Sequence, residues 1–389
     1  MGGAASVDVH GTRLDDRSWP SAFVAWRNLD PQLTAYAALL TAMGLAMAYS
    51  NSVEAGRSLG QASPVFVRGV LWTGIAAVVF VALTRFEYRW LRTFAWPLYF
   101  VQLVLLGVTL ALGEGVGGAA RWISIGPIAF QFSEVAKILM IVVLANYLAA
   151  RSGRLRSLAS ILGAVVLVAP ALILVLLQPD LGTSLVFGAI LAGMLFMSGA
   201  SLRWLAVLAG LLAAAVPIAW TYLLREYQKA RLISFLDPGA DIHGPGYQLY
   251  QAQVAIGSGG WIGKGLTNGT QSQLDYLPVQ TTDFVYALLA EELGLVGGIV
   301  VLTLFVALLW RVLVAGWRSP DVFGTIFCCG VASMILFQLV VNVGMVVGLM
   351  PITGIPLPFV THGGASLVTT AAALGIIQSI NLRRTRPAW

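Results

Sequence analysis

Long apolar stretches dominate the pattern of hydrophobic and polar positions along the chain. A helix needs about 20 mostly apolar residues to cross a bilayer, so each stretch of that length predicts one membrane-spanning helix. The pattern predicts ten such helices, over residues 34–53, 67–84, 94–112, 133–149, 158–178, 182–200, 203–224, 293–315, 323–348 and 364–381. The expected fold class is therefore an all-α polytopic membrane protein.

The composition agrees with this fold class. Of the 389 residues, 58% are hydrophobic and 10% are charged, whereas about 25% of the residues in an average soluble domain are charged. The mean hydropathy is +0.84. These values exclude an ordinary soluble protein and also a disordered or coiled-coil chain. The net charge of +6 does not indicate a nucleic-acid partner, because the basic residues follow the predicted membrane topology.

The distribution of charges orients the predicted helices, because Lys and Arg accumulate in short cytoplasmic loops. An even number of spans places both chain ends on one side, and that side carries 15 of the 23 Lys and Arg residues but 6 of the 17 Asp and Glu residues. Both termini are therefore predicted to be cytoplasmic. Residues 1–30 are expected to form a cytoplasmic tail without a cleavable signal peptide, and residues 31–389 a single membrane domain.

Residues 225–283 form a long loop between the seventh and eighth predicted spans, on the extracytoplasmic side. Long loops often carry function. The loop begins with residues 225–235, whose pattern is typical of an amphipathic interfacial helix. Its glycine-rich run, residues 257–265, is not a phosphate-binding loop, because Gly265 follows Lys264 where Ser or Thr is required.

Ionisable side chains close to apolar stretches are candidates for function. Asp283 and Asp180 each precede an apolar stretch, so each is either a helix N-cap or a functional carboxylate. Glu134 and Lys137 are three residues apart, which predicts an ion pair on one helix face, and structural pairing alone would also explain them. Arg121 is suited either to anchoring at the membrane interface or to binding a phosphate.

Residues 348–366 contain three prolines and four glycines, so they cannot form a continuous helix. Irregular backbone near a membrane is tolerated where it is buried in protein or lines a water-filled cavity. We therefore expect this segment to wall a polar cavity that contains Asp283. Glu291 lies about 80° around a helix from Asp283 and could join the same site, whereas Glu292 points to the opposite face.

Metal and redox chemistry based on Cys or His is not indicated. The two cysteines, Cys328 and Cys329, are neighbours in an apolar run, where geometry disfavours a disulfide between them. The three histidines are scattered and do not have zinc-ligand spacing.

Several motifs together identify a family. They are Arg121-Trp122, Gln131–Lys137, Gln178–Thr183, Ala255–Gly260, Gly269–Leu274, Thr282–Phe284 with Ala290–Gly294, and Thr353–Phe359. From the first span onward the chain resembles the SEDS proteins (shape, elongation, division, sporulation), and two of these motifs resemble the RodA branch rather than the FtsW branch. The chain departs from the family pattern at Val279, Thr281, His362 and Ala365.

The resemblance implies a peptidoglycan glycosyltransferase. Such an enzyme polymerises lipid II, a disaccharide-pentapeptide on undecaprenyl diphosphate, into glycan strands at the outer face of the bacterial cytoplasmic membrane, for cell elongation and rod shape. The implied partners are lipid II, membrane lipid and a class B penicillin-binding protein that acts as transpeptidase. The alternatives are a flippase for lipid-linked precursors and a non-catalytic scaffold of the wall-synthesis complex.

The resemblance also implies the site. In the family the Asp that matches Asp283 is essential, and the positions of Glu134, Lys137 and Asp180 line the same cavity. We expect Asp283 to act as a general base toward a sugar hydroxyl, or, together with Asp180, to bind a divalent cation such as Mg²⁺ or Mn²⁺. The expected substrate-binding residues are Arg121, Glu134, Lys137, Gln178, Asp180, Lys264 and Ser366.

Overall fold

The computed structural model describes residues 28–52, 64–116, 119–125, 128–153, 155–222, 224–236, 244–273, 283–361 and 363–383. Three features discussed above lie outside the described residues. They are residues 1–27 of the predicted tail, residues 274–282 with the departures at Val279 and Thr281, and His362.

Long apolar helices make up most of the described chain. Ten of them correspond to the predicted spans: α1 (Pro31–Ser52), α2 (Pro64–Arg85), α4 (Ala95–Leu112), α5 (Phe132–Ala149), α6 (Leu158–Leu177), α7 (Leu181–Met197), α8 (Leu202–Tyr222), α12 (Val285–Trp317), α13 (Val322–Val346) and α14 (Gly364–Leu382). Within the described residues, nine are long and apolar enough to cross a membrane, and α7 is an apolar helix of 17 residues. The predicted all-α polytopic membrane fold is confirmed, while the count of ten spans stays a prediction.

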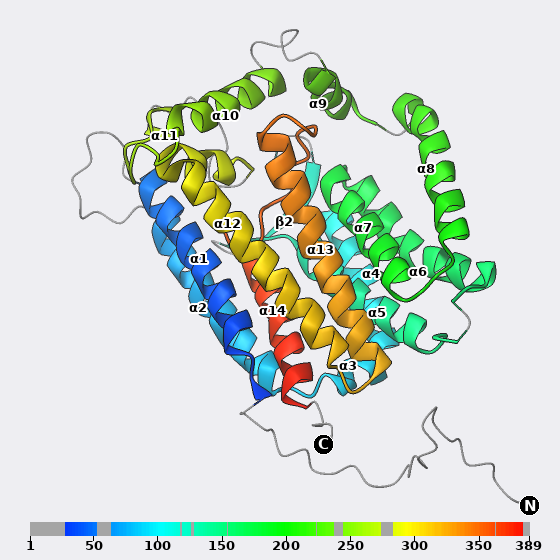
Figure 1. The fold of residues 1–389 in the computed structure, drawn as a ribbon. Coiled ribbons are helices and arrows are strands. Elements are labelled where there is room, and N and C mark those ends of the chain that lie inside the picture. Colours follow the sequence, from blue (N-terminus) through cyan, green and yellow to red (C-terminus); the bar gives the residue numbers. More distant parts are fainter. Residues whose placement is uncertain are drawn as a thin grey trace, which may run out of the picture.

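The two ends of the helix bundle differ in structure. Helix α1 begins and α14 ends at the same end of the bundle, near the short helix α3 (Arg89–Thr93) (Figure 1). Helices α9 (Glu226–Leu236), α10 (Pro245–Gly259) and α11 (Thr270–Gln273) lie across the opposite end. The long segment after α8 is thus largely helical where it is described. A helix is confirmed at the predicted place by α9, and its position at a membrane interface stays a prediction.

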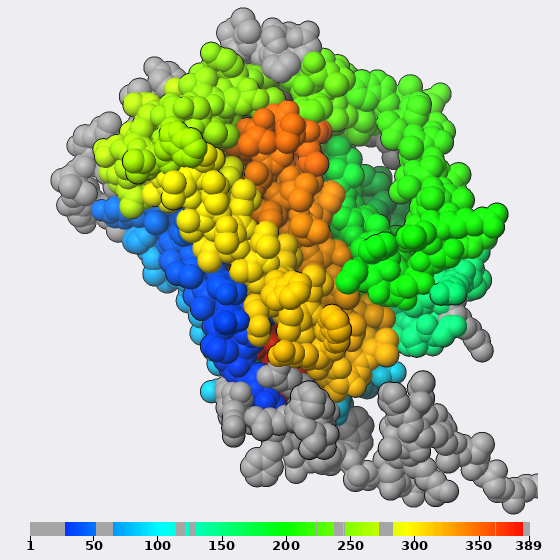
Figure 2. All heavy atoms as spheres, viewed as in Figure 1, coloured from blue at the N-terminus to red at the C-terminus, as the bar shows by residue number. Residues whose placement is uncertain are grey.

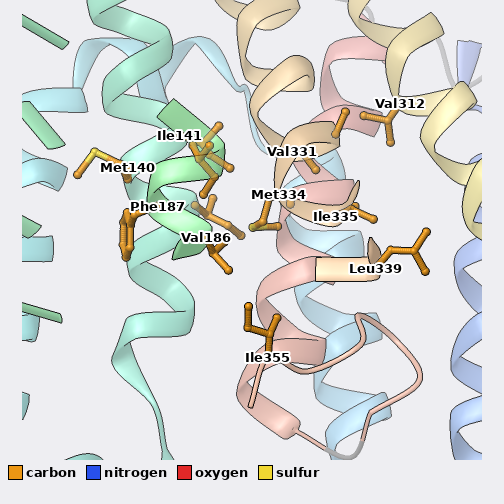
Figure 3. Packing of buried hydrophobic residues seen from close by; sticks show 14 of the residues in the cluster. Met140, Ile141, Val186, Phe187, Val312, Val331, Met334, Ile335, Leu339 and Ile355 are labelled. Carbon is orange, nitrogen blue, oxygen red and sulfur yellow. The ribbon is translucent and has the colours of Figure 1, made fainter. Parts of the chain in front are cut away.

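The centre of the bundle is formed by α5, α7, α13 and α14. Ile141 of α5, Phe187 of α7 and Met334 of α13 belong to one buried hydrophobic cluster (Figure 3). Lipid tails are as apolar as these side chains, so close packing rather than the hydrophobic effect favours association of helices inside a membrane. The densely packed centre therefore provides a rigid support for the polar groups above it.

Helix α8 stands apart from this centre. None of its residues is buried, and an opening separates its upper part from the rest of the bundle (Figure 2). A helix that is apolar around its whole circumference needs apolar surroundings. Its sides that lack protein neighbours are therefore suited to lipid.

A small antiparallel sheet connects α4 to α5 and was not predicted. It consists of β1 (Glu114–Val116), β2 (Ala119–Ile125) and β3 (Ile128–Phe130), with β2 in the middle. Two of its strands have only three residues, which is too short for a recognisable alternation of polar and apolar positions. The sheet matters for the site because its central strand carries Arg121.

Helix α12 contains a break at Gly294, whose φ of 68° and ψ of −169° are not helical. The break lies one residue after the predicted start of the eighth span, so only the part of α12 that follows Gly294 corresponds to that span. The α10–α11 connection packs here, and the Gly265 amide donates a hydrogen bond to the Glu292 carbonyl (2.9 Å). A Cβ on Gly294 would collide with the backbone at Gly263.

We predict that Gly294→Ala destabilises the protein. The substitution places a Cβ at a positive φ against backbone atoms, which costs about 1–3 kcal/mol from the backbone conformation alone. The matched control is Gly74→Ala in α2, where a Cβ would meet no atom within 4 Å, and where alanine is the better helix former. Thermal unfolding of the purified protein in detergent should show a lower midpoint for the first variant only. Equal midpoints would contradict the packing described here.

Candidate active site

A polar cavity of about 190 Å³ lies between the sheet, the centre of the bundle and α9. Its walls come from β2, the start of α5, the start of α7, α9, Asp283 just before α12, the irregular segment before α14, and α14 itself. Five of the eight site residues predicted from the sequence line it: Arg121, Glu134, Asp180, Asp283 and Ser366. The irregular segment contributes Gly354, Pro356, Thr361 and Gly363, so its predicted place in a cavity wall is confirmed.

Asp180 is both a helix cap and a wall residue of the cavity. It is the N-cap of α7, where its carboxylate accepts hydrogen bonds from the Thr183 amide (3.1 Å) and the Thr183 hydroxyl (2.8 Å). The Gln131 side chain donates a further bond (3.1 Å), and Arg121 forms an ion pair with it at 3.7 Å. The side chain is 6% exposed. The capping interpretation is therefore confirmed, and it does not exclude a place in the site.

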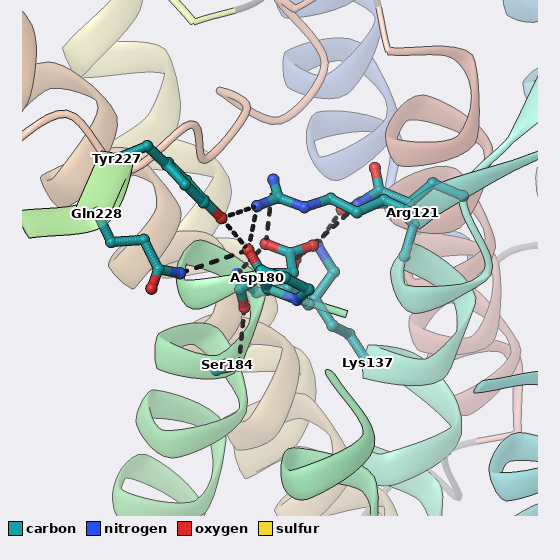
Figure 4. A network of polar contacts seen from close by, with 10 residues as sticks. Arg121, Lys137, Asp180, Ser184, Tyr227 and Gln228 are labelled. Atoms are coloured by element: carbon teal, nitrogen blue, oxygen red, sulfur yellow. Dashed lines mark hydrogen bonds and ion pairs between the residues drawn. The ribbon is translucent and has the colours of Figure 1, made fainter. Parts of the chain in front are cut away.

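Arg121 is held from several sides. Besides its ion pair with Asp180, its guanidinium donates to the Pro179 carbonyl and to the Tyr227 hydroxyl (3.4 Å), as Figure 4 shows. Tyr227 also donates to the Pro179 carbonyl at 2.7 Å. Because Tyr227 belongs to α9, these bonds join α9 to the sheet and to the start of α7. The arginine is thus fixed with its guanidinium at the edge of the cavity.

Glu134 and Lys137 form the predicted ion pair on α5. The Lys137 ammonium donates to the Glu134 carboxylate at 2.8 Å, and both side chains are nearly inaccessible, at 2% and 4% exposed. Glu134 lines the cavity, whereas Lys137 is not among its wall residues. Lys137 therefore stands behind the wall, where it compensates the negative charge of Glu134.

Asp283 lies at the start of α12 and is partly exposed. The N-cap of α12 is the next residue, Phe284. The backbone of Asp283 is held by Asn342 of α13, whose amide donates to the Asp283 carbonyl (3.2 Å) and to the Ile355 carbonyl (2.8 Å). This buried asparagine was not predicted, and it connects the backbone of Asp283 to the irregular segment opposite.

Two predicted site residues lie elsewhere. Gln178 is buried at the end of α6 and donates to the Leu106 carbonyl of α4 (2.8 Å). Lys264 forms an ion pair with Glu291 at 2.7 Å and also donates to Thr270 at 2.7 Å. Glu291 is therefore committed to Lys264 rather than placed beside Asp283, while Glu292 bonds Ser50 of α1.

The sequence reasoning missed Arg231. This residue of α9 lines the cavity together with Arg121. A Cβ on Gly354 would lie 3.5 Å from the Asp283 carboxylate and 3.6 Å from the Arg231 guanidinium, so both groups face the same point of the irregular segment. The sequence offered one signal: Arg231 lies one helical turn after Tyr227, so the two side chains share one face of α9.

Among the described residues, no group of three or more His, Cys, Asp or Glu side chains is arranged to hold a metal ion. The oxygens of Asp180 accept hydrogen bonds from Thr183 and Gln131, and the binding of a divalent cation by Asp283 and Asp180 stays a prediction.

Fold and cavity together define a multi-pass membrane protein with buried charged groups around one polar site. The sequence profile of the FtsW/RodA/SpoVE family, described as a cell cycle protein, matches residues 31–386. The chain belongs to this family, and the resemblance found from the motifs is confirmed.

Known proteins that are similar to the chain support its assignment to this family. Peptidoglycan glycosyltransferase MrdB of Escherichia coli is 38% identical over 340 residues, which cover 87% of this chain and 92% of MrdB. A chain solved in a study of the structural coordination of polymerization and crosslinking by a peptidoglycan synthase complex is 32% identical. It matches with a TM-score of 0.76, covering 92% of this chain and 99% of that one. The rod shape determining protein RodA of Thermus thermophilus is 30% identical with a TM-score of 0.69, covering 93% and 99%.

We predict that Lys137→Met strongly destabilises the protein, because it leaves the Glu134 carboxylate buried without its cation. Removing one partner of a buried ion pair costs about 3–5 kcal/mol. Replacing both partners, as Glu134→Leu with Lys137→Met, should recover most of the loss in thermal midpoint. If the double variant were as unstable as the single one, charge compensation would not be the role of Lys137.

A further prediction concerns Lys264, which the sequence assigned to substrate binding. Lys264→Met leaves the buried Glu291 carboxylate without a cation, and should cost about 1–3 kcal/mol of stability. The control is Lys229→Met, whose partner Glu226 is exposed, and it should change stability by less than about 0.5 kcal/mol. A Lys264 variant with an unchanged melting point but weaker substrate binding would instead favour the assignment made from the sequence.

Proposed function

We propose that this protein is a peptidoglycan glycosyltransferase that polymerises lipid II at the outer face of the cytoplasmic membrane. One observation carries the proposal: a carboxylate, Asp283, lines the same polar cavity as the arginines Arg121 and Arg231 in a chain whose family includes named peptidoglycan glycosyltransferases. The cavity lies at the end of the bundle where α9 is found, which is the extracytoplasmic end in the predicted topology.

Asp283 is proposed as the general base. A sugar hydroxyl that attacks the anomeric carbon of a donor must lose its proton as the new bond forms, and a carboxylate within hydrogen-bond reach typically accelerates such a step about 10²–10⁴-fold. Of the three carboxylates in the cavity wall, Glu134 is paired with Lys137 and Asp180 caps α7. Asp283 also lines the cavity, is partly exposed, and is held through its backbone by Asn342.

The two arginines are proposed to bind the diphosphate of the donor. Diphosphate is a good leaving group, so its negative charge needs neutralising more than it needs a proton. The guanidinium group offers several donors in a fixed plane that suits phosphate oxygens. Lys137, which the sequence suggested for this task, is occupied by Glu134 behind the wall, and Arg231 takes its place in the proposal.

The proposed reaction is a single displacement with inversion. The hydroxyl attacks the face of the sugar opposite to the diphosphate, its proton passes to the base, and the diphosphate leaves from the other face. Glu134, Asp180 and Ser366 then act as wall residues that position the substrates. Ser366 fits such a role because its hydroxyl is buried without a hydrogen-bond partner within the described residues.

We also propose a protein partner and a division of the chain into a tail and a membrane domain. A similar chain was solved in a study of a peptidoglycan synthase complex, which supports an assembly with a class B penicillin-binding protein as transpeptidase. Residues 31–389 are proposed to act as one membrane domain, with residues 1–30 as a cytoplasmic tail. The proposal places the chain in the cytoplasmic membrane of a bacterium.

The test is polymerisation of fluorescent lipid II by purified wild type and Asp283→Asn, each with and without the penicillin-binding partner, with polymer measured on a gel. We expect polymer from the wild type and a loss of at least about 10²-fold in the variant, which keeps the size of the side chain but cannot accept a proton. Parallel reactions with EDTA distinguish the two roles of Asp283: polymerisation by the wild type that persists with EDTA supports a general base, and its loss supports a cation ligand.

The matched control for this experiment is Asp321→Asn at the other end of the bundle. Asp321 caps α13 and accepts a hydrogen bond from Tyr88 (2.7 Å), so its loss should lower stability rather than remove activity. Polymerisation by a well-folded Asp283→Asn variant would overturn the assignment of the base. No polymer from the wild type under any condition would favour a flippase or a scaffold.

A further inference from the structure

A hollow of about 880 Å³ lies where α5 ends and α6 begins. Glu134, near the start of α5, lines the polar cavity, so the other end of this 18-residue helix lies far from that cavity. In the predicted topology this end of the bundle is cytoplasmic. We call the hollow the basic hollow; its lining includes Tyr147, Arg151, Ser152, Ser157, Ala159 and Ser160.

The connection between α5 and α6 has an excess of positive charge. Residues 150–157 contain three arginines and no acidic residue. Two of the arginines, Arg151 and Arg156, are exposed and form no ion pair within the part of the chain that the structure describes. Positive charge that the protein does not compensate attracts anions to its surroundings. The hollow therefore suits an anionic ligand.

Arg151 is held in one orientation by an aromatic ring. Its guanidinium carbon lies 3.9 Å from the centroid of the Tyr147 ring. The Tyr147 hydroxyl donates to the Ser160 carbonyl (3.1 Å) and occupies the space that a side chain on Gly163 would need, so the ring is fixed against α6. Apart from a long contact of 3.5 Å to the Tyr147 carbonyl, the N–H groups of Arg151 have no partner within the described residues. Stacking covers the face of a guanidinium and leaves its edge available for phosphate oxygens.

The basic hollow lies beside an apolar surface. Leu158, Leu162 and Val166 of α6 are exposed and recur every four residues, so they share one face of the helix. Helix α6 is among those long and apolar enough to cross a membrane. Its first residue, Leu158, directly follows Ser157, which lines the hollow. A polar space next to an apolar helix face matches the head and the chains of one phospholipid, whereas a soluble anion would use only the polar part.

We propose that the basic hollow binds the phosphate of an anionic phospholipid, such as phosphatidylglycerol, whose acyl chains lie along the exposed face of α6. Arg151 contacts the phosphate, and Ser152 and Ser157 border the space for the rest of the headgroup. Basic clusters at the cytoplasmic ends of membrane helices are suited to such lipids. A lipid with an additional positive charge is disfavoured beside the arginines. The hollow is separate from the polar cavity, so this proposal does not depend on the proposed function.

Two variants test the proposal independently. Arg151→Gln removes the charge of an exposed side chain, and Ala159→Phe fills the hollow from α6. The matched control is Arg318→Gln at the C-cap of α12, which removes an exposed arginine on the same predicted face of the membrane. Arg318 does not line the hollow, so the control changes the net charge equally without changing the site. If one of the two test variants fails to fold, the other still gives the answer.

The measurement is titration of the purified full-length protein in detergent with phosphatidylglycerol, with bound lipid counted by native mass spectrometry. We expect saturable binding to the wild type that is about tenfold weaker in both test variants, because hydrogen bonds from a charged donor contribute about that factor. Binding to Arg318→Gln should be unchanged, and phosphatidylcholine should bind the wild type at least about tenfold more weakly. An equal loss in Arg318→Gln, no loss in Arg151→Gln, or equal binding of phosphatidylcholine would overturn the proposal.

Two further arms identify the source of the phosphate and its place. Glycerol 3-phosphate carries the same anionic group without acyl chains, so an equimolar amount should leave the bound phosphatidylglycerol in place. Displacement of the lipid would indicate a site for soluble anions and overturn the proposal. Phosphatidylglycerol with a diazirine near its headgroup should label the peptide that spans residues 147–160, and about tenfold less in Arg151→Gln. Labelling confined to other segments would also overturn it.

Discussion

A charge enclosed by apolar helices must be compensated, and the site of this protein is built on that requirement. Asp180 is compensated by groups from three elements: Thr183 of α7, Gln131 before α5 and Arg121 of β2. One carboxylate thus fixes the sheet against two helices of the bundle. Arg121 in turn bonds Tyr227, which brings α9 over the cavity. The arrangement of the outer elements follows from satisfying a few buried polar groups.

The same requirement explains what could be predicted from the sequence. Membrane spans depend on local composition, so the apolar stretches predicted the ten long helices, and the predicted start of the eighth span falls beside the break at Gly294. Ionisable residues are rare in such a chain, so those near the spans could be recognised as site candidates. Asp180, Glu134 and Asp283 do line one cavity. The ion pair of Glu134 with Lys137 followed from helical spacing alone.

What could not be predicted depends on contacts between distant parts of the chain. Lys264 and Arg231 are both basic residues of the long segment after α8, and composition does not distinguish them. Arg231 faces the cavity because α9 is held there through Tyr227, whereas Lys264 is drawn to Glu291, 27 residues further along the chain. Asn342 was missed for the same reason. Its side chain connects the backbone carbonyls of Asp283 and Ile355, and the sequence around Asn342 does not indicate these partners.

The irregular segment before α14 is where the polar and apolar parts of the molecule meet. Its residues Gly354 and Pro356 line the charged cavity, whereas Phe359 lines an apolar cavity between α1, α2 and α14. Thr361 and Gly363 line the polar cavity and also a narrow space beside Trp72 of α2. The prolines and glycines of residues 348–366 exclude a continuous helix, so one short irregular segment borders both a polar and an apolar environment.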